Sequence, residues 1–232
     1  MSEPATLRVM TYNVRSLRDD AAAVSRVIRE AQPHVVCVQE APRFLRWRSR
    51  AAALARTSGL LVIAGGRGAA GNLLLCSLAV EVTHRAEVLL SHRPKTHPRG
   101  VVVAVCSLRG HRFALAGTHL DLAAAERRLH ADELLDALPR SGVGADIPVI
   151  LAGDFNEQRE EPARRRIAAA LTDTADDTPT YPAKNPVRRI DSIYADPRLR
   201  FVRSWVVGTA DVMLASDHRP VVAEIDLEDR TS

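Results

Sequence analysis

Asp154 and Asn156 lie two residues apart at the end of the apolar segment Leu151-Ala-Gly-Asp-Phe-Asn156. Residues i and i+2 of a strand project from the same face, so these two side chains can reach one common point. A carboxylate that accepts and an amide that donates hydrogen bonds there can orient a water molecule beside a phosphate group. The pair therefore predicts a site for phosphoester hydrolysis at the carboxyl end of a buried strand.

Three more polar residues end earlier predicted strands: Asn13, Glu40 and His119. A carboxylate directly after an apolar strand, such as Glu40, is a good ligand for a hard metal ion. Imidazole titrates near neutrality, so His119 can donate to a phosphate oxygen or to a leaving group. Taken singly, each has an ordinary structural alternative: Asn13 as a turn residue, Glu40 as an exposed loop acid, and His119 as a hydrogen-bonded histidine near a strand end.

The last third of the chain adds Asp191, Asp217 and His218. Asp191 lies inside an apolar strand, which is an expensive place for an unpaired charge. Asp217 and His218 precede the final strand, and adjacent side chains point in different directions. Asp217 can therefore face a metal ion while His218 faces a phosphate, with Asp191 as the carboxylate that orients the imidazole. All of these polar sites fall at predicted strand ends, which coincidence explains poorly.

The elements that must position these residues follow from the hydrophobic periodicity. Strands are predicted at 7–14, 35–38, 60–64, 73–77, 79–90, 101–108, 112–119, 147–152, 190–195, 201–207 and 220–225. Helices are predicted at 21–30, 123–138 and 160–171, and another begins at Pro42 and runs through Leu54. We expect strand-connecting turns at 65–71 and 109–111, and a polar, proline-containing loop at 173–185. No linker divides the chain, so 1–232 is expected to be one α/β domain with two sheets packed face to face and helices outside.

Composition limits the partners and the compartment. The formal net charge is +4, which allows a polyanionic partner without requiring one. Only two of the 32 basic residues, Lys95 and Lys184, are lysine. Arginine binds phosphate with two parallel hydrogen bonds, but arginine that is spread along the chain also fits a purely compositional bias. The three cysteines lie in apolar runs and no secretory signal precedes them, so we expect buried free thiols and a cytoplasmic location.

Together these motifs resemble the endonuclease/exonuclease/phosphatase superfamily, which includes deoxyribonuclease I-like and exonuclease III-like enzymes. The resemblance implies a four-layered α/β-sandwich, in which helices flank two packed, mostly antiparallel sheets, and a Mg²⁺-dependent hydrolase in which Mn²⁺ can replace Mg²⁺. The matching segments are Thr11-Tyr-Asn-Val14, Val38-Gln-Glu40, Gly117-Thr-His-Leu-Asp121, Gly153-Asp-Phe-Asn156, Ile190-Asp-Ser-Ile193 and Ser216-Asp-His218.

The resemblance also implies a metal-binding group and a catalytic group. Glu40 resembles the metal carboxylate of the family, Asn13 a neighbouring polar ligand, and Asp217 a further carboxylate on the metal side. The catalytic group comprises residues that align the water or contact the phosphate: His119, Asp154, Asn156, Asp191 and His218. In this group Asp154 resembles the residue that aligns or deprotonates the attacking water, and His218, backed by Asp191, the histidine at the scissile phosphate.

Asn72, Arg99 and Arg189 are further candidates for substrate binding, although exposed arginines are common. The segment 65–72 contains no acid, whereas deoxyribonuclease I-like enzymes pair the first histidine with a glutamate there. Repair nucleases carry an aspartate at the position of Arg15 and a tyrosine at that of His119, so abasic-site repair is disfavoured.

We therefore expect a monomeric, Mg²⁺-dependent phosphodiesterase with nucleic acid as its leading substrate. The alternatives are a phosphatase or phosphodiesterase for a small molecule, a nucleotide or a lipid headgroup, and a catalytically silent binding protein on the same fold.

Overall fold

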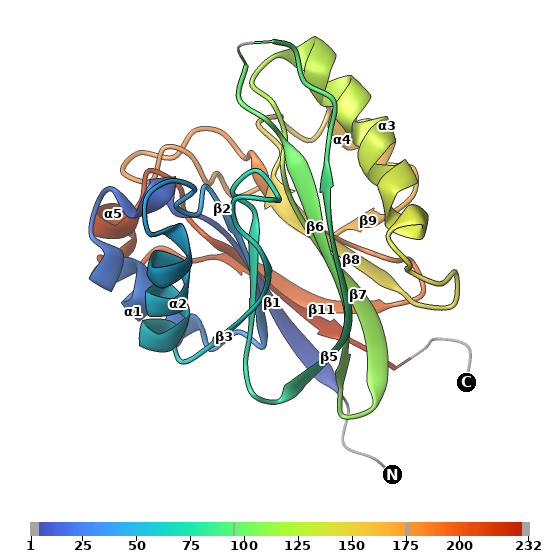
Figure 1. Cartoon of the computed structure of the whole chain (residues 1–232), viewed down its shortest axis with the longest axis horizontal. Helices are drawn as coiled ribbons and strands as arrows, with labels where there is room; N and C mark the ends of the chain where they lie inside the picture. Colours follow the sequence, from blue (N-terminus) through green and yellow to red (C-terminus); the bar gives the residue numbers. More distant parts are fainter. Residues whose placement is uncertain (1–4, 95, 175–176, 229–232) are drawn as a thin grey trace.

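The computed structural model describes residues 5–94, 96–174 and 177–228. In that part of the chain, two six-stranded sheets pack face to face and helices cover both outer faces (Figure 1). The layers follow the order helices, sheet, sheet, helices. The predicted four-layered α/β-sandwich is confirmed.

Sheet A has the strand order β11-β12-β1-β2-β4-β3. Its strands are β1 (Thr6–Asn13), β2 (Val35–Gln39), β3 (Leu61–Gly65), β4 (Leu73–Cys76), β11 (Arg200–Val206) and β12 (Val221–Asp226). Only β1 and β2 run parallel, with Asn13 opposite Gln39 at their carboxyl ends. The turn at 65–71 joins the antiparallel pair β3 and β4, as predicted.

Sheet B has the order β5-β6-β7-β8-β10-β9. Its strands are β5 (Val80–Leu89), β6 (Gly100–Leu108), β7 (His111–His119), β8 (Val149–Asp154), β9 (Thr172–Asp173) and β10 (Asp191–Ala195). The pair β7 and β8 is parallel, and its last register partners are His119 and Asp154. Antiparallel β10 begins beside the same point, because Asp191 pairs with Asp154.

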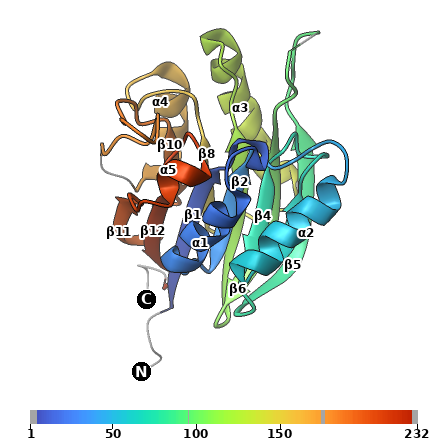
Figure 2. The ribbon, with the colours of Figure 1, turned by 90° about the vertical axis from the view of Figure 1, so that its left-hand side faces the viewer.

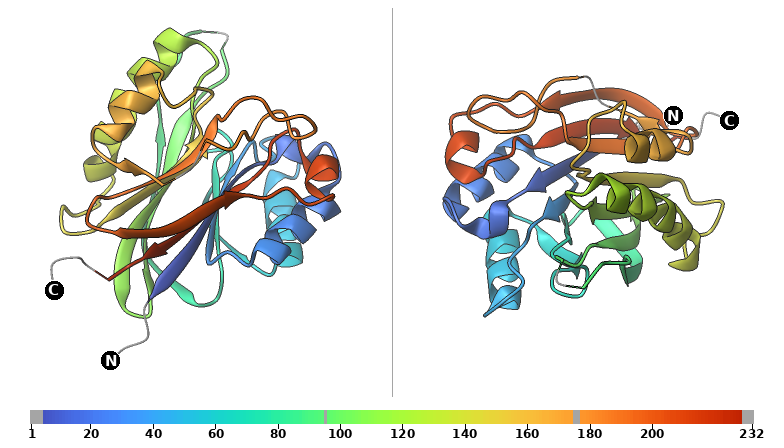
Figure 3. Two further views of the ribbon diagram at one scale, coloured as in Figure 1. Left: turned by 180° about the vertical axis from the view of Figure 1, so that it is seen from behind. Right: turned by 90° about the horizontal axis from the view of Figure 1, so that it is seen from above.

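Two groups of helices cover the outer faces. Sheet A is covered by α1 (Ala21–Ala31), α2 (Trp47–Ser58) and the short α5 (Val212–Ala215), which face the viewer in Figure 2. Sheet B is covered by α3 (Ala124–Arg140) and α4 (Pro162–Ala168), on the opposite side of the molecule (Figure 3). A 3-10 turn at Arg15–Leu17 follows β1. None of the helices in the described ranges has the length and apolar character that crossing a bilayer requires.

Strand β2 shows why the central strands are apolar throughout. Val35 and Cys37 pack between the two sheets, whereas Val36 and Val38 pack under the helices of sheet A. Successive side chains of a strand point to opposite faces, so a strand buried on both faces needs apolar residues at every position. This burial makes β2 a rigid support for the polar residue that follows it.

The helix predicted to begin at Pro42 begins only at Trp47. The segment before it is held in another path, because Ala41 N donates to Gly71 O at 2.8 Å and Arg46 has a left-handed backbone with φ 58°. The short β9 and α5 were also not predicted. Both are too brief for a hydrophobic period to register.

Candidate active site

The predicted polar residues meet at one edge of the sandwich. Parallel strands β1, β2, β7 and β8 end there, and antiparallel β10 and β12 begin there. A parallel strand contributes the residue at its end, whereas an antiparallel neighbour contributes the residue at its start. This topology explains why residues far apart in the sequence reach the same place.

Asn13 bridges the two sheets. Its Nδ2 donates to Glu40 Oε1 at 3.2 Å and to Asp154 Oδ2 at 3.0 Å. Ser216 Oγ donates to the Asn13 carbonyl at 2.7 Å, which ties the segment before β12 to the end of β1. Glu40 has φ 51°, a left-handed conformation that is uncommon outside glycine and concentrates at functional sites. Two carboxylates from different sheets therefore share one amide donor.

Asp154 and Asn156 meet through a turn rather than through strand alternation. Strand β8 ends at Asp154, and Asn156 has a left-handed backbone with φ 52°. Asp154 Oδ1 accepts from Asn156 N at 2.9 Å, a side-chain-to-backbone bond of the kind that aspartate favours in turns. The two side chains lie close together, as predicted, but for a different geometric reason.

His119 is neutral in this environment. Burial lowers the pKa of His119 to about 3, and the positive charges of Arg99, His218 and Arg43 act in the same direction against Asp154. Asn156 Nδ2 already donates to Leu120 O, which fixes the amide orientation, and it lies 3.0 Å from His119 Nε2. His119 Nε2 is therefore the acceptor, and the ring carries its proton on Nδ1.

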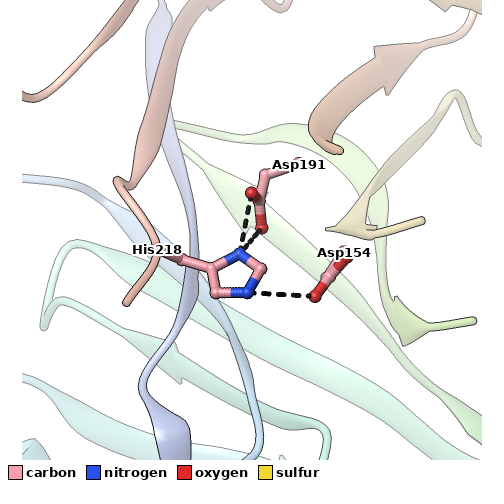
Figure 4. A group of neighbouring side chains, drawn as sticks. All are labelled: Asp154, Asp191 and His218. Atoms are coloured by element: carbon pink, nitrogen blue, oxygen red, sulfur yellow. Dashed lines mark hydrogen bonds and ion pairs between the residues drawn. The ribbon is translucent and has the colours of Figure 1, made fainter. Parts of the chain in front are cut away.

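His218 carries a positive charge instead. Its Nδ1 lies 3.0 and 3.2 Å from the two oxygens of Asp191, and its Nε2 lies 3.7 Å from Asp154 Oδ2 (Figure 4). Burial alone would lower the pKa of His218, but Asp191, Asp154 and Asp217 outweigh it and raise the pKa to about 10. The buried charge of Asp191 is thus compensated by an imidazolium, as the sequence suggested.

Two groups of ligand atoms can be compared for a metal ion. Within the described ranges, Asp154, Asp191 and His218 each offer a ligand atom, and these atoms lie within 4.8 Å of one another. A cation there would displace the proton between Asp191 and His218. Glu40 and Asp154 are carboxylates on either side of the Asn13 amide, and Glu40 is partly exposed. The second group fits a hard divalent cation better, because Mg²⁺ prefers oxygen ligands.

Asp217 lies at the side of this network. Its Oδ2 is 3.5 Å from Arg15 Nε, and its Oδ1 is 3.4 Å from Ser216 Oγ. Ser216 also contacts Asn13, so the carboxylate is one hydroxyl away from the central amide.

The three predicted substrate-binding residues differ in position. Arg99 is close to the site, with Nε 3.5 Å from Asp121 Oδ2. Asn72 is buried and donates both amide hydrogens to the backbone carbonyls of Ala69 and Gly100. These two hydrogen bonds hold a turn. Arg189 is 5% exposed, and its Nη2 contacts Ser192 Oγ at 3.4 Å.

Three residues of the site were not anticipated. The Tyr181 ring lies 4.8 Å from the His218 ring, Ser216 holds Asn13, and the charge of Arg43 reaches His119. Ser216 lies next to Asp217, and Arg43 lies three residues after Glu40. Their closeness in sequence to predicted site residues could therefore have identified them. Tyr181 comes from the predicted loop at 173–185, where nothing in the sequence marked it.

Comparisons with known proteins agree with this architecture. A family model, the Endonuclease/Exonuclease/phosphatase family, matches residues 10–218. Among solved structures, an endonuclease/exonuclease/phosphatase family protein from Bacteroides thetaiotaomicron has a TM-score of 0.81 at 18% identity, covering 97% of this chain and 98% of that one. A mannosyl-6-phosphatase from the same species has a TM-score of 0.81 at 17% identity, covering 94% and 99%.

A third structure, D. rerio TDP2 complexed with a single-strand DNA product, has a TM-score of 0.74 at 18% identity and covers 96% and 99% of the two chains. At such identities these likenesses show a shared fold. The search of curated proteins found no match.

Proposed function

The chain belongs to the endonuclease/exonuclease/phosphatase family, and we propose that it is a metal-dependent hydrolase of phosphodiesters, with nucleic acid as its leading substrate. One observation carries the proposal. Asp154 Oδ2 lies 3.4 Å from His119 Nε2, 3.7 Å from His218 Nε2 and 3.0 Å from Asn13 Nδ2. A carboxylate oxygen surrounded by two imidazoles and an amide is a suitable environment for a water molecule that attacks a phosphorus atom.

The proposed role of each residue in hydrolysis follows from its charge state. Asp154 accepts the proton of the water, and Asn156, whose Nδ2 donates to Leu120 O and His119 Nε2, holds the water through its Oδ1. The imidazolium of His218, kept charged by Asp191, stabilises the negative charge that develops on the phosphoryl oxygens. Neutral His119 contacts the phosphate or the leaving oxygen.

Glu40, Asn13 and Asp217 are the residues that we propose to hold the metal ion, Mg²⁺ or Mn²⁺. The ion would supply Lewis-acid neutralisation of charge on the phosphate oxygens. The supporting observation is that the carboxylates of Glu40 and Asp154 lie on either side of the Asn13 amide, whose Oδ1 accepts from Arg15 N at 3.1 Å.

The similar structures include a mannosyl-6-phosphatase and a TDP2 complex with a single-strand DNA product, so one is named for a sugar phosphate and the other contains nucleic acid. A phosphatase or phosphodiesterase for a small molecule, nucleotide or lipid headgroup is therefore the main alternative. A catalytically silent binding protein is disfavoured, since Glu40, Asp154, Asn156, Asp217 and His218 are all present.

A panel assay with Mg²⁺ tests the proposal. Purified protein is incubated with plasmid DNA, single-stranded RNA, bis-p-nitrophenyl phosphate and p-nitrophenyl phosphate, with Asp154→Asn protein as the inactive control. We expect cleavage of the diesters, loss of activity in EDTA, and a steep fall with salt on DNA or RNA, because phosphate contacts release counterions. Turnover of the monoester alone would favour the phosphatase alternative. Full activity in EDTA would refute the metal-dependent reading.

The free, buried state of Cys37, Cys76 and Cys106 supports our proposal of a reducing, cytoplasmic location. We also propose that the protein acts as a monomer, which size-exclusion chromatography with light scattering would test.

A further inference from the structure

Two arginines from different segments are held against the same turn beside the active site. Arg43 follows β2, and its Nη1 donates to Ala70 O at 3.3 Å. Arg99 precedes Gly100, whose carbonyl accepts from Asn72 Nδ2 at 2.9 Å. The turn at 65–72 therefore contacts the Arg43 guanidinium directly and the backbone next to Arg99.

Two glycines allow this close arrangement. A Cβ atom at Gly71 would lie 2.9 Å from Arg43 Cδ, so the arginine stem crosses the turn where no side chain stands. A Cβ atom at Gly100 would lie 3.3 Å from the carbonyl of Ala69. The backbone next to Arg99 thus approaches the same turn that Arg43 contacts.

Both arginines border the proposed catalytic residues. Arg43 lies three residues after Glu40 in one loop. Arg99 pairs with Asp121, two residues after His119, and Thr118 Oγ1 donates to Gly100 O at 3.1 Å. The charges of both arginines act on His119, whose pKa burial has already lowered. The pair therefore lies on the His119 side of the site.

The two arginines of this pair differ in their acidic partners. The Arg99 side chain is only 11% exposed and has Asp121 as its partner. Within the described part of the chain, no carboxylate lies within salt-bridge distance of Arg43. Burial lowers the pKa of Arg43, and the neighbouring charge of Arg99 lowers it further, against the smaller opposite effect of Glu40.

Two buried arginines elsewhere, Arg127 and Arg164, are paired with acids. Arg164, for example, is fully buried and meets Asp173 at 2.6 Å. The positive charges of Arg43 and Arg99 repel each other, and an anion bound between them would relieve this repulsion. Phosphate suits this position, since guanidinium groups bind its oxygens with paired, charge-assisted hydrogen bonds.

We propose that Arg43 and Arg99 form a subsite for a second phosphate group of the substrate, separate from the phosphate that is hydrolysed at Asp154. The subsite selects phosphodiesters that carry an adjacent phosphate, such as a phosphorylated end of a nucleic-acid strand or an internal linkage flanked by another. This inference rests on the proposed hydrolase function and specifies its substrate class.

The kinetic test compares thymidine dinucleotides that differ only in terminal phosphorylation. The substrates have hydroxyl groups at both ends, a 5′-phosphate, or a 3′-phosphate, and kcat/KM is measured with Mg²⁺. We expect at least one phosphorylated form to be cleaved about tenfold or more faster than the hydroxyl form. Arg43→Ala and Arg99→Ala should remove that preference, and Arg43→Lys should restore part of it. The control is Arg46→Ala, an exposed arginine of the same loop, which should keep the preference.

A binding measurement tests the same subsite without turnover. In EDTA, with the Asp154→Asn substitution as background, calorimetry compares thymidine 3′,5′-bisphosphate with thymidine 5′-monophosphate. We expect tighter binding of the bisphosphate, and loss of that difference when Arg43→Ala is added. The melting temperature of each variant checks that the fold is retained.

The outcomes separate the two proposals. If wild-type protein cleaves no diester but prefers the bisphosphate through Arg43, the hydrolase proposal fails and the anion subsite stands. If the arginine variants lose equal factors on phosphorylated and unphosphorylated substrates, or lose nothing, the second-phosphate subsite is wrong.

Discussion

The Asn13 amide donates to Asp154 Oδ2 at 3.0 Å, and this bond joins the end of β1 in sheet A to the end of β8 in sheet B. The polar site is therefore divided between the two sheets, and its geometry depends on how the sheets pack. Each residue has its own neighbours, so the contribution of each can be tested separately.

Asp154→Asn should reduce hydrolysis by at least about 10³-fold, because the amide cannot accept the proton of the attacking water. The fold should remain, because the substituted side chain has nearly the same shape. Steady-state rates with the best diester of the panel and a thermal melt measure both effects. Asp146→Asn, at an exposed aspartate, is the matched control. Retained turnover in Asp154→Asn would mean that another residue orients the water.

Asn13→Ala should weaken activation by Mg²⁺ about 10- to 100-fold, the range found when residues that support metal ligands are removed. The substitution leaves Glu40 Oε1 and Asp154 Oδ2 without their shared donor. The measurement is the Mg²⁺ concentration that gives half-maximal rate. Asn185→Ala changes an exposed asparagine and should leave this concentration unaltered. An unchanged Mg²⁺ requirement in Asn13→Ala would exclude Asn13 from the metal site.

The raised pKa of His218, about 10 against an ordinary value of 6.5, links folding stability to pH. A group whose pKa is raised by folding stabilises the native state fully below its unfolded pKa and loses that effect as pH rises through the folded value. In metal-free buffer, wild type should thus be more stable than His218→Gln at pH 6, and the difference should shrink as pH approaches 10. Urea melts at several pH values measure it. A difference that grows with pH would contradict the charged state of His218.

Arg164 anchors a buried polar network under the site. Its guanidinium contacts Tyr194 Oη at 2.7 Å, Asp173 Oδ2 at 2.6 Å and Ser192 Oγ at 3.0 Å. Arg164→Met should lower the unfolding free energy by about 3–5 kcal/mol, because it removes the short, buried ion pair of Asp173 and leaves this carboxylate the longer contact with Arg159 at 3.8 Å. Arg166→Ala breaks a pair with Asp132 at the surface and should cost less than about 1 kcal/mol. Similar losses in both variants, measured by urea unfolding, would show that the buried network is not stabilising.

Most of the fold was predicted from the hydrophobic periodicity of the sequence. The uninterrupted apolar run of β2 predicted a doubly buried strand, and Val36 and Cys37 indeed face opposite layers. The predicted start of α2 was wrong. The path of residues 41–46 is held by the hydrogen bond from Ala41 N to Gly71 O, and Gly71 lies thirty residues further along the chain. Local sequence does not encode such a contact.

The candidate site also contains some residues that the sequence predicted and others that it did not. The positions of Asn13, Asp154 and His218 near predicted strand ends were enough to predict that they lie at one edge of the sandwich. Their roles stay predictions. The position of Arg43 depends on packing against Ala70, in a turn that has no acidic or basic residue except Arg67. Tyr181 reaches His218 from a loop whose path no periodic pattern specifies. Residues whose positions depend on packing against distant segments cannot be predicted from the local pattern of a single sequence.

Strand β12 lies between β11 and β1 in sheet A, and His218 stands just before it. During synthesis on the ribosome, the first strand emerges long before the partner that completes its sheet. The imidazolium therefore joins Asp191 and Asp154 only after nearly the whole polypeptide has been translated. A prematurely terminated chain that ends before residue 218 would lack this histidine, so we predict that such an unfinished copy would lack the proposed hydrolytic activity.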